Sequence, residues 1–203
     1  ENTCRAIAVQ RDYAIKNPGA FAGYGPDLWG LTACDGPDRP RKLIDGRRQQ
    51  FAGYAARGAP LGPDDGTLAP WVPLACLPFE PKLAMAATRH ILTEYPEVLP
   101  DARFIGSFNP SVRADSTAGW LNERCVGLDQ GILVMMIENS RSGLIWDLMR
   151  QAPVIRRGDA VRVTLESETF SVSYSAIANQ DGRIGETIAL RGNDPKTLLS
   201  AIV

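Results

Sequence analysis

The sequence has few of the side chains from which metal and redox centres are built. It contains a single histidine, His90, and four cysteines that are far apart and form no Cys-x-x-Cys pair. Zinc sites gather cysteine and histidine ligands, and a disulfide scaffold needs a denser cysteine pattern. The sequence therefore predicts no metal and no cofactor, and the cysteines are interpreted as small buried hydrophobic residues.

Long apolar runs and a charge of one sign are also absent. The longest apolar run covers residues 132–137, whereas a membrane-spanning helix needs roughly 20 apolar residues. The net charge is −1, from 22 basic and 23 acidic residues, which argues against nucleic acid or an anionic membrane as a partner. The first residues do not have the pattern of a signal peptide. We therefore expect no membrane span and no nucleic-acid partner.

The composition is that of an ordinary globular chain. Of 203 residues, 44% are hydrophobic and 22% charged, and this length suits one large domain or two small ones with a real core. The 19 glycines and 15 prolines predict many loops.

Hydrophobic periodicity separates a helical part from a strand-rich tail. Helical spacing predicts helices over residues 1–17, 81–95 and about 129–149, the last interrupted by Gly143. Long loops fill residues 20–78 and 99–126. Alternation at period two predicts strands near residues 161–165, 170–174, 187–190 and 198–203. These patterns indicate an α+β fold, with helices and long loops first and a small all-β module last.

The loops carry the side chains that a sugar site uses. Pyranose rings stack on aromatic faces, their hydroxyls bind carboxylates and amides, and glycoside hydrolysis needs two carboxyl groups that flank the bond. Suitable aromatic residues are Tyr24, Trp29, Trp71 and Trp120. Suitable polar residues are Asp35, Asp64, Asp65, Asn109, Asp129, Gln130 and Glu138. The pattern predicts a carbohydrate site without fixing which of these residues form it.

Each candidate also has a purely structural interpretation. Asp-Gly and Pro-Asp pairs are typical of turns, and tryptophans usually pack in the core. Asp129 suits a helix N-cap, Glu138 suits a solvated helix face, and His90 suits a surface or core-edge position. The residues by themselves leave these alternatives open.

Several motifs occur in a fixed order along the chain: GYGPDLWGLTACDGP, YAARGAP, DDGTLAP, LPFEP, FNP and GLDQGILVMMIENSRSGLIWDLMR. Together they resemble the glycoamylase-like family of bacterial glycoside hydrolases, which includes β-1,2-glucan hydrolases and the matching domain of cyclic β-1,2-glucan synthases. The resemblance covers about residues 1–158. It implies an (α/α)6 toroid with the sugar site at the mouth of its loops, and an oligo- or polysaccharide partner of the β-glucan class.

The resemblance also implies roles for named residues. The expected catalytic carboxylates are Asp35, Asp129 and, behind them, Glu138. The expected substrate-binding residues are Tyr24, Trp29, Asp65, Asn109 and Gln130. A toroid needs many more helices than the three predicted here, so we expect the C-terminal part of the family domain. Whether that part hydrolyses glucan alone is left open.

The tail carries a different pair of motifs. IRRGDAVRV at residues 155–163 and GRIGETIALR at residues 182–191 resemble the C-terminal β domain of flagellar P-ring assembly chaperones, a SAF-type or β-clip module. This resemblance implies a periplasmic or secreted location and a P-ring subunit as a possible partner. It carries over no catalytic residue.

The two resemblances predict two domains, a partial glycoamylase-like domain at residues 1–156 and a small β domain at 157–203. The leading hypothesis is a glycoside hydrolase-like protein that acts on or binds β-glucan, most of all β-1,2-linked glucan. One alternative is a non-enzymatic periplasmic chaperone or binding module for P-ring assembly. The other is a chimeric chain, spliced, recombined or artificial, without a joint function.

Overall fold

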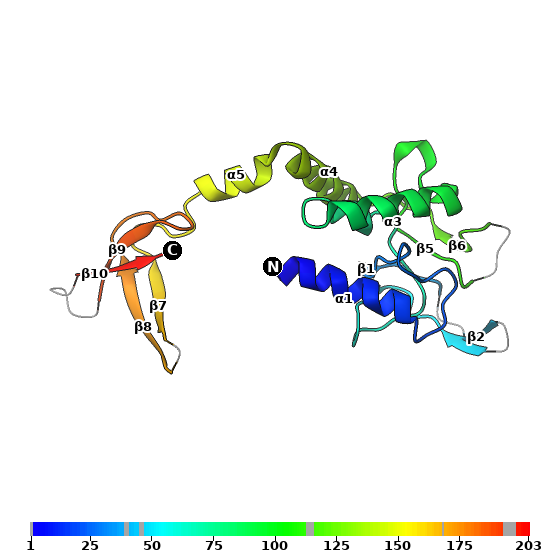
Figure 1. Cartoon of the computed structure of the whole chain (residues 1–203), viewed down its shortest axis with the longest axis horizontal. Helices are drawn as coiled ribbons and strands as arrows, with labels where there is room; N and C mark the ends of the chain where they lie inside the picture. Colours follow the sequence, from blue (N-terminus) through cyan, green and yellow to red (C-terminus); the bar gives the residue numbers. More distant parts are fainter. Residues whose placement is uncertain (1, 39–40, 45–46, 113–115, 168, 193–197) are drawn as a thin grey trace. The chain divides into compact units, whose positions relative to one another are not determined.

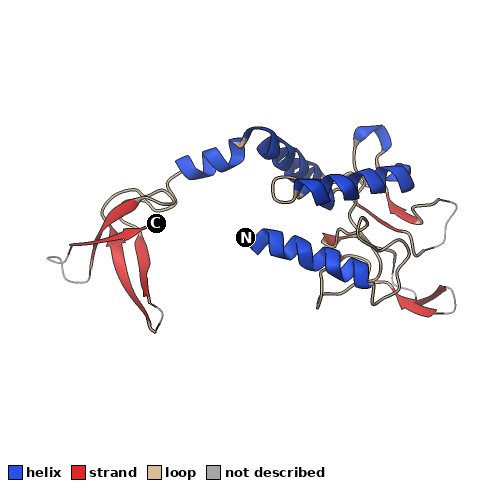
Figure 2. Cartoon of the chain, viewed as in Figure 1, coloured by secondary structure: helices blue, strands red, loops and turns tan. Residues whose placement is uncertain are grey.

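A computed structural model describes residues 2–38, 41–44, 47–112, 116–167, 169–192 and 198–203. The chain divides into two compact units, Glu1–Ser142 and Gly143–Val203, which we call the N-terminal and C-terminal units and describe separately. Helices and strands are both present (Figures 1 and 2), so the mixed α+β prediction is confirmed. The predicted domain boundary after residue 156 lies inside the C-terminal unit, between its helix and its strands.

The N-terminal unit contains helices in all three places where helical spacing predicted them, and further short ones. Its helical elements are α1 (Asn2–Lys16), α2 (Val72–Ala75), α3 (Pro81–Glu94), α4 (Gly127–Ser142) and the 3-10 turns η1 (Pro96–Val98) and η2 (Pro100–Ala102). Helix α3 begins at Pro81, whose fixed φ suits the first helical position. Its buried side chains, Ala84, Ala87 and Ile91, recur at helical spacing, and α2 packs against both α3 and α4.

Gly143 ends one helix and precedes another, as the sequence indicated. Helix α4 stops at Ser142, and α5 (Leu144–Gln151) follows. The φ of Gly143 is 73°, a left-handed conformation that glycine adopts without a steric penalty. Within the described ranges, no helix combines the length and the apolar character that crossing a bilayer requires.

Short antiparallel strand pairs cross the segments that the sequence predicted as loops. They are β1 (Ala33–Cys34) with β4 (Ala55–Ala56), β2 (Arg41–Ile44) with β3 (Arg47–Gln50), and β5 (Ser107–Asn109) with β6 (Trp120–Asn122). The first pair aligns Cys34 with Ala55, and the last aligns Ser107 with Asn122. These two pairs carry or adjoin Asp35, Tyr54 and Asn122 of the candidate site, and α4 carries Asp129.

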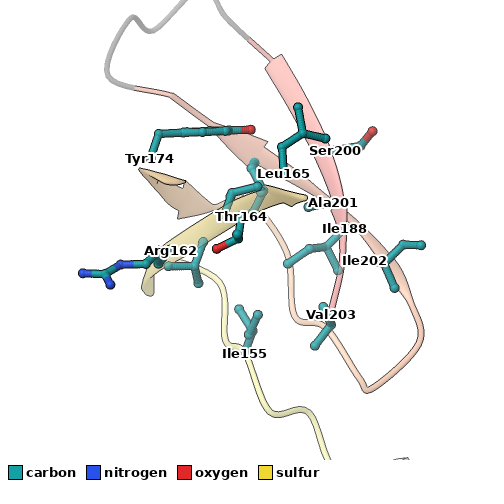
Figure 3. Close-up of a pocket in the computed structure, with 13 residues that line it drawn as sticks. Ile155, Arg162, Thr164, Leu165, Tyr174, Ile188, Ser200, Ala201, Ile202 and Val203 are labelled. Atoms are coloured by element: carbon teal, nitrogen blue, oxygen red, sulfur yellow. The ribbon is translucent and has the colours of Figure 1, made fainter. Parts of the chain in front are cut away.

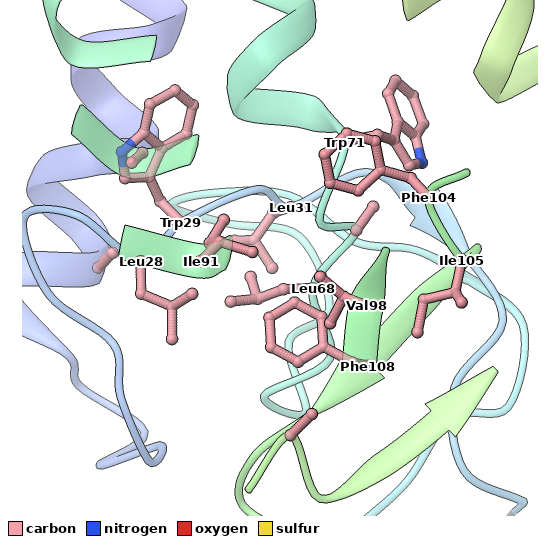
Figure 4. Packing of buried hydrophobic residues seen from close by; sticks show 14 of the residues in the cluster. Leu28, Trp29, Leu31, Leu68, Trp71, Ile91, Val98, Phe104, Ile105 and Phe108 are labelled. Carbon is pink, nitrogen blue, oxygen red and sulfur yellow. The ribbon is translucent and has the colours of Figure 1, made fainter. Parts of the chain in front are cut away.

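The core of the N-terminal unit forms where the sequence motifs meet (Figure 4). Trp29, Leu68 and Phe108 come from three motifs and are each at most 2% exposed. The backbones of Leu68 and Phe108 exchange two hydrogen bonds of 2.9 Å. Gly30, at φ 144°, lies where a Cβ would come within 2.7 Å of the Ala69 carbonyl oxygen, so this close approach requires glycine. The motifs therefore define the packing of the unit.

The C-terminal unit is α5 followed by a four-stranded antiparallel sheet. Its strands are β7 (Ala160–Glu166), β8 (Ser171–Ala178), β9 (Thr187–Arg191) and β10 (Leu198–Ile202), in the order β10-β9-β8-β7. All four correspond to predicted strands. A small core of Ala176, Ala178, Ile188 and Leu190 is buried in this sheet. Figure 3 shows Ile188 close to Ala201 and Val203 on one face.

Candidate functional site

Asp35 lies directly after β1 and is held by the β5–β6 pair. Its backbone carbonyl accepts a hydrogen bond of 2.5 Å from the Ser107 hydroxyl. Its carboxylate oxygen Oδ2 accepts one of 3.3 Å from the side-chain amide Nδ2 of Asn122. Ser107 and Asn122 are partners in the β5–β6 register, so one strand pair fixes both the backbone and the carboxylate of Asp35. The side chain stays half-buried rather than enclosed.

Asp129 lies in the first turn of α4. The helix begins at Gly127, so Asp129 is inside the turn rather than at the N-cap position that one interpretation gave it. Burial raises the pKa of its carboxyl group above the ordinary value, and the indole of Trp71 acts in the opposite direction by favouring the ionised form. Asp129 therefore keeps its proton to a higher pH than an exposed aspartate.

Asp35 and Asp129 line the same cavity although they are far apart in the sequence. The cavity has a volume of about 170 Å³. Its lining residues are Ala33, Cys34, Asp35, Tyr54, Gly106, Asn122, Val126, Leu128 and Asp129. The structure thus brings two of the three predicted catalytic carboxylates to one cavity.

Glu138, the third predicted catalytic residue, lies further along α4. Nine residues separate it from Asp129, which in an α-helix is a rise of about 13 Å and half a turn of rotation. Its carboxylate accepts two hydrogen bonds of 2.9 Å from Arg141 and one of 2.8 Å from the Ser142 hydroxyl. Glu138 does not line the cavity that Asp35 and Asp129 share.

Asp65 is 3% exposed and makes a dense set of hydrogen bonds. Arg57 donates to both carboxylate oxygens, each at 2.8 Å. The backbone N–H groups of Ala52 and Thr67 donate at 3.0 and 3.1 Å. Burial opposes ionisation, but the hydrogen bonds, above all those from Arg57, outweigh it and lower the pKa of Asp65. In this position Asp65 joins loops to each other, and direct substrate contact stays a prediction.

Tyr24 and Trp29, the predicted aromatic wall, are both buried. Trp29 is 2% exposed and packs in the core (Figure 4). Tyr24 is 9% exposed, and its hydroxyl donates a 2.9 Å hydrogen bond to Asp64. Burial and the nearby carboxylate raise the pKa of Tyr24 far above its ordinary value. Neither ring offers an open face to a sugar in this structure.

Asn109 and Gln130 are also engaged with the protein itself. The Asn109 amide donates to the Asp65 carbonyl at 2.9 Å and to the Thr67 hydroxyl at 3.0 Å, and the side chain is fully buried. The Gln130 amide donates to the Phe104 carbonyl at 3.0 Å. Both side chains hold the backbone near the cavity, and their contact with substrate stays a prediction.

Two cavity residues were not singled out from the sequence. Tyr54 lies in a glycine-containing loop, and Asn122 is the last residue of β6. An exposed aromatic residue in a loop is a weak signal, and the partner of Asn122 becomes visible only when the fold brings β6 to Asp35. Among the described residues, no group of three or more His, Cys, Asp or Glu side chains is arranged to hold a metal ion.

Comparison with protein families matches the two parts of the chain separately. Residues 1–153 match the Glycoamylase family, described as "Putative glucoamylase". Residues 138–203 match the family described as "Chaperone for flagella basal body P-ring formation". Both resemblances seen in the motifs are thereby confirmed, and the two matches share residues 138–153.

A curated relative and solved structures agree with the first match. The chain is 32% identical over 160 residues to an exo β-1,2-glucooligosaccharide sophorohydrolase (non-reducing end) of Parabacteroides distasonis, covering 78% of this chain and 19% of the relative. A β-1,2-glucanase structure from the same species matches with TM-score 0.59 and 31% identity over 74% of this chain and 19% of that one. The endo-β-1,2-glucanase of Chitinophaga pinensis, in a sophorotriose and glucose complex, matches with TM-score 0.59 and 30% identity over 75% and 32%.

The chain spans 19% to 32% of the length of these relatives. The family match covers residues 1–153 of the chain. That match includes the strands that hold Asp35 and the helix turn that carries Asp129. Over these residues the chain belongs to the Glycoamylase family.

Proposed function

We propose that the N-terminal unit is a glycoside hydrolase-like module that binds β-glucan, and specifically β-1,2-linked glucan, at the cavity between Asp35 and Asp129. The observation that carries the proposal is that two carboxylates from distant motifs line one small cavity. Membership of the Glycoamylase family supports it, as do the β-1,2-glucan names of the relatives.

The two carboxylates are suited to different tasks in acetal hydrolysis. Asp129, whose pKa burial raises, is suited to donate a proton to the glycosidic oxygen. Asp35, whose carboxylate accepts from Asn122, is suited to act as the second carboxylate of the pair. A separation of about 6.5–9.5 Å would give inversion, and one of about 5–5.5 Å would give retention.

The proposal also covers the fold types of the two units. We infer that the N-terminal unit corresponds to the C-terminal part of an (α/α)6 toroid, and that the sheet of the C-terminal unit is a β-clip. A periplasmic or secreted location is consistent with a polymeric glucan substrate. Hydrolysis of β-glucan by this chain is likewise part of the proposal.

The test is glucan binding and cleavage by the purified chain. Reducing-sugar release from β-1,2-glucan and calorimetric titration with sophorotriose should both give a signal, and Asp35→Asn and Asp129→Asn should abolish release. Asp101→Asn is a matched control, because Asp101 is an exposed carboxylate in the same unit. The absence of both binding and release in the wild-type chain would overturn the proposal.

A second candidate function concerns the C-terminal unit alone. Its sheet borders a cavity of about 520 Å³ (Figure 3), and two of the lining residues, Leu165 and Ile202, are 59% and 74% exposed. Such an apolar surface, together with the chaperone family match, favours contact with a protein partner such as a P-ring subunit.

A pull-down of a P-ring subunit by the full chain tests this second candidate. Leu165→Ser and Ile202→Ser should both reduce capture. Ile184→Ser is the matched control, because Ile184 is 58% exposed in the same unit but does not line the cavity. Equal capture by all three variants would contradict the assignment.

A further inference from the structure

Tyr54 and Asp35 lie at the same end of the β1–β4 pair. The register aligns Ala33 with Ala56 and Cys34 with Ala55, and Asp35 and Tyr54 are the next residues along the two chains. Both residues line one cavity. An aromatic residue and a candidate catalytic carboxylate are therefore present at the same site.

The ring of Tyr54 is open to solvent at this position. Tyr54 is 69% exposed, and two other residues that line the cavity, Leu128 and Val126, are 72% and 38% exposed. Large exposed apolar side chains that line a hollow together with carboxylates are characteristic of a ligand site. The ligand that fits is amphipathic, with apolar faces and a polar rim, which is the chemistry of a pyranose.

The backbone around Tyr54 is fixed although its ring is free. The N–H of Gly53 donates to the Pro37 carbonyl at 3.1 Å, and the Gly53 carbonyl accepts from Arg57 at 2.9 Å. Gly53 has a φ of 60°, in the left-handed region that suits glycine. A ring presented from an anchored backbone loses little conformational freedom when a ligand covers it.

We propose that the Tyr54 ring is the platform on which one glucosyl residue of the bound glucan stacks, with Leu128 as a further apolar contact and the sugar hydroxyls directed to Asp35 and Asn122. This inference rests on the proposed glucan-binding function and adds its aromatic contact. Tyr54 thereby replaces the buried Tyr24 and Trp29 as the aromatic residue that a sugar reaches.

Calorimetric titration of the full chain with sophorotriose tests the platform. Tyr54→Ala should weaken binding by about tenfold, which corresponds to about 1.4 kcal/mol, while Tyr54→Phe keeps the ring face and should retain most of the affinity. Saturation-transfer NMR should show transfer from the aromatic resonances to the sugar C–H protons in the wild type, reduced in Tyr54→Ala. Tyr174→Ala, in the C-terminal unit, is the matched control and should bind like the wild type.

The possible results distinguish failure of the Tyr54 stacking proposal from failure of the proposed glucan-binding function. If the wild type binds, Asp35→Asn impairs the site and Tyr54→Ala binds with unchanged affinity, the platform is overturned while the glucan site stands. If Tyr54→Phe loses as much affinity as Tyr54→Ala, the hydroxyl rather than the ring face is responsible, which also overturns stacking. If the wild type binds no glucan, the proposed function fails and the platform fails with it.

Discussion

Arg57 and Asp65 form a bidentate ion pair inside the N-terminal unit, with Nε–Oδ1 and Nη2–Oδ2 distances of 2.8 Å and side chains that are 0% and 4% exposed. The same guanidinium donates to the carbonyl oxygens of the residues that immediately precede Asp35 and Tyr54. One ion pair therefore fixes the backbone on two sides of the candidate cavity. Asp65 can contribute to glucan binding in this way without touching the glucan.

Asp65→Asn should destabilise the chain strongly. Removing one charge leaves the Arg57 guanidinium buried without its counter-charge, which typically costs about 3–5 kcal/mol. Urea unfolding followed by circular dichroism measures the loss. Asp101→Asn is the control, since Asp101 pairs with Arg103 at the surface, and a change within about 0.5 kcal/mol is expected there. Equal effects of the two substitutions would contradict the structural role of the buried pair.

Asp64→Asn should have the opposite effect on the free energy of unfolding at neutral pH. Burial raises the pKa of Asp64, so ionisation at pH 7 costs folding free energy. The neutral amide oxygen can still accept from the Tyr24 hydroxyl and the Gly66 N–H. We expect Asp64→Asn to be at least as stable as the wild type at pH 7, with the advantage vanishing below about pH 3.9, the unfolded pKa. Chemical unfolding across this range measures it, and a clear destabilisation at pH 7 would refute it.

The contribution of Asp65 to stability should depend on pH in the opposite way to that of Asp64. Its pKa is lowered in the folded state, so its stabilising contribution is complete above the unfolded pKa of about 3.9 and is lost as the pH falls through the folded value. The stability difference between wild type and Asp65→Asn should therefore shrink in acid. A difference that stays constant down to the acid transition would mean that the ion pair does not supply it.

The long elements could be predicted because each carries many repeats of its pattern. Helix α3 shows helical spacing over Ala84, Ala87 and Ile91 and has a proline at its start. Strands β7 and β8 alternate over enough residues to be distinguished from a helix. The β1–β4 and β5–β6 pairs are two or three residues long, too short for any period, and distant partners determine them. Those pairs position Asp35 and Asn122 of the candidate site.

The candidate site could be predicted only in part for the same reason. Motif order indicated Asp35 and Asp129, and the structure places both at one cavity. Composition could not separate an aromatic residue in the core, such as Trp29, from one at the surface, such as Tyr54, because the two differ in burial and not in kind. Asn122 is recognisable as the partner of Asp35 only once the strands are assembled.

Gly106→Ala should weaken glucan binding through Asn122. A Cβ at position 106 would lie 3.0 Å from the Asn122 side-chain nitrogen and 3.2 Å from the Arg124 carbonyl oxygen, so the amide would shift away from Asp35. Gly131→Ala in α4 is the matched control, because a Cβ there meets nothing within 4 Å. This substitution should stabilise the helix by about 1 kcal/mol. Titration with sophorotriose compares the two, and unchanged binding by Gly106→Ala would argue against positioning by Asn122.

Trp71→Phe should raise the pKa of Asp129 further. Burial already raises this pKa, and the Trp71 indole opposes the effect by favouring the carboxylate, so its removal leaves burial less opposed. Carboxyl-carbon NMR titration gives the pKa directly, with Asp129→Asn to assign the resonance. If the chain cleaves glucan, the alkaline limb of its pH–rate profile should move to higher pH in Trp71→Phe. A lowered pKa would show that the indole is not the opposing group.

Glu138→Gln tests which of the two carboxylates on α4, Asp129 or Glu138, acts together with Asp35. Glu138 lies on α4 outside the cavity, where its partners are Arg141 and Ser142. We therefore expect Glu138→Gln to bind and cleave glucan like the wild type, whereas Asp129→Asn, on the same helix, does not cleave. Reducing-sugar release measured on the two variants side by side gives the answer. Loss of release in Glu138→Gln, with binding intact, would assign the catalytic role to Glu138 and remove it from Asp129.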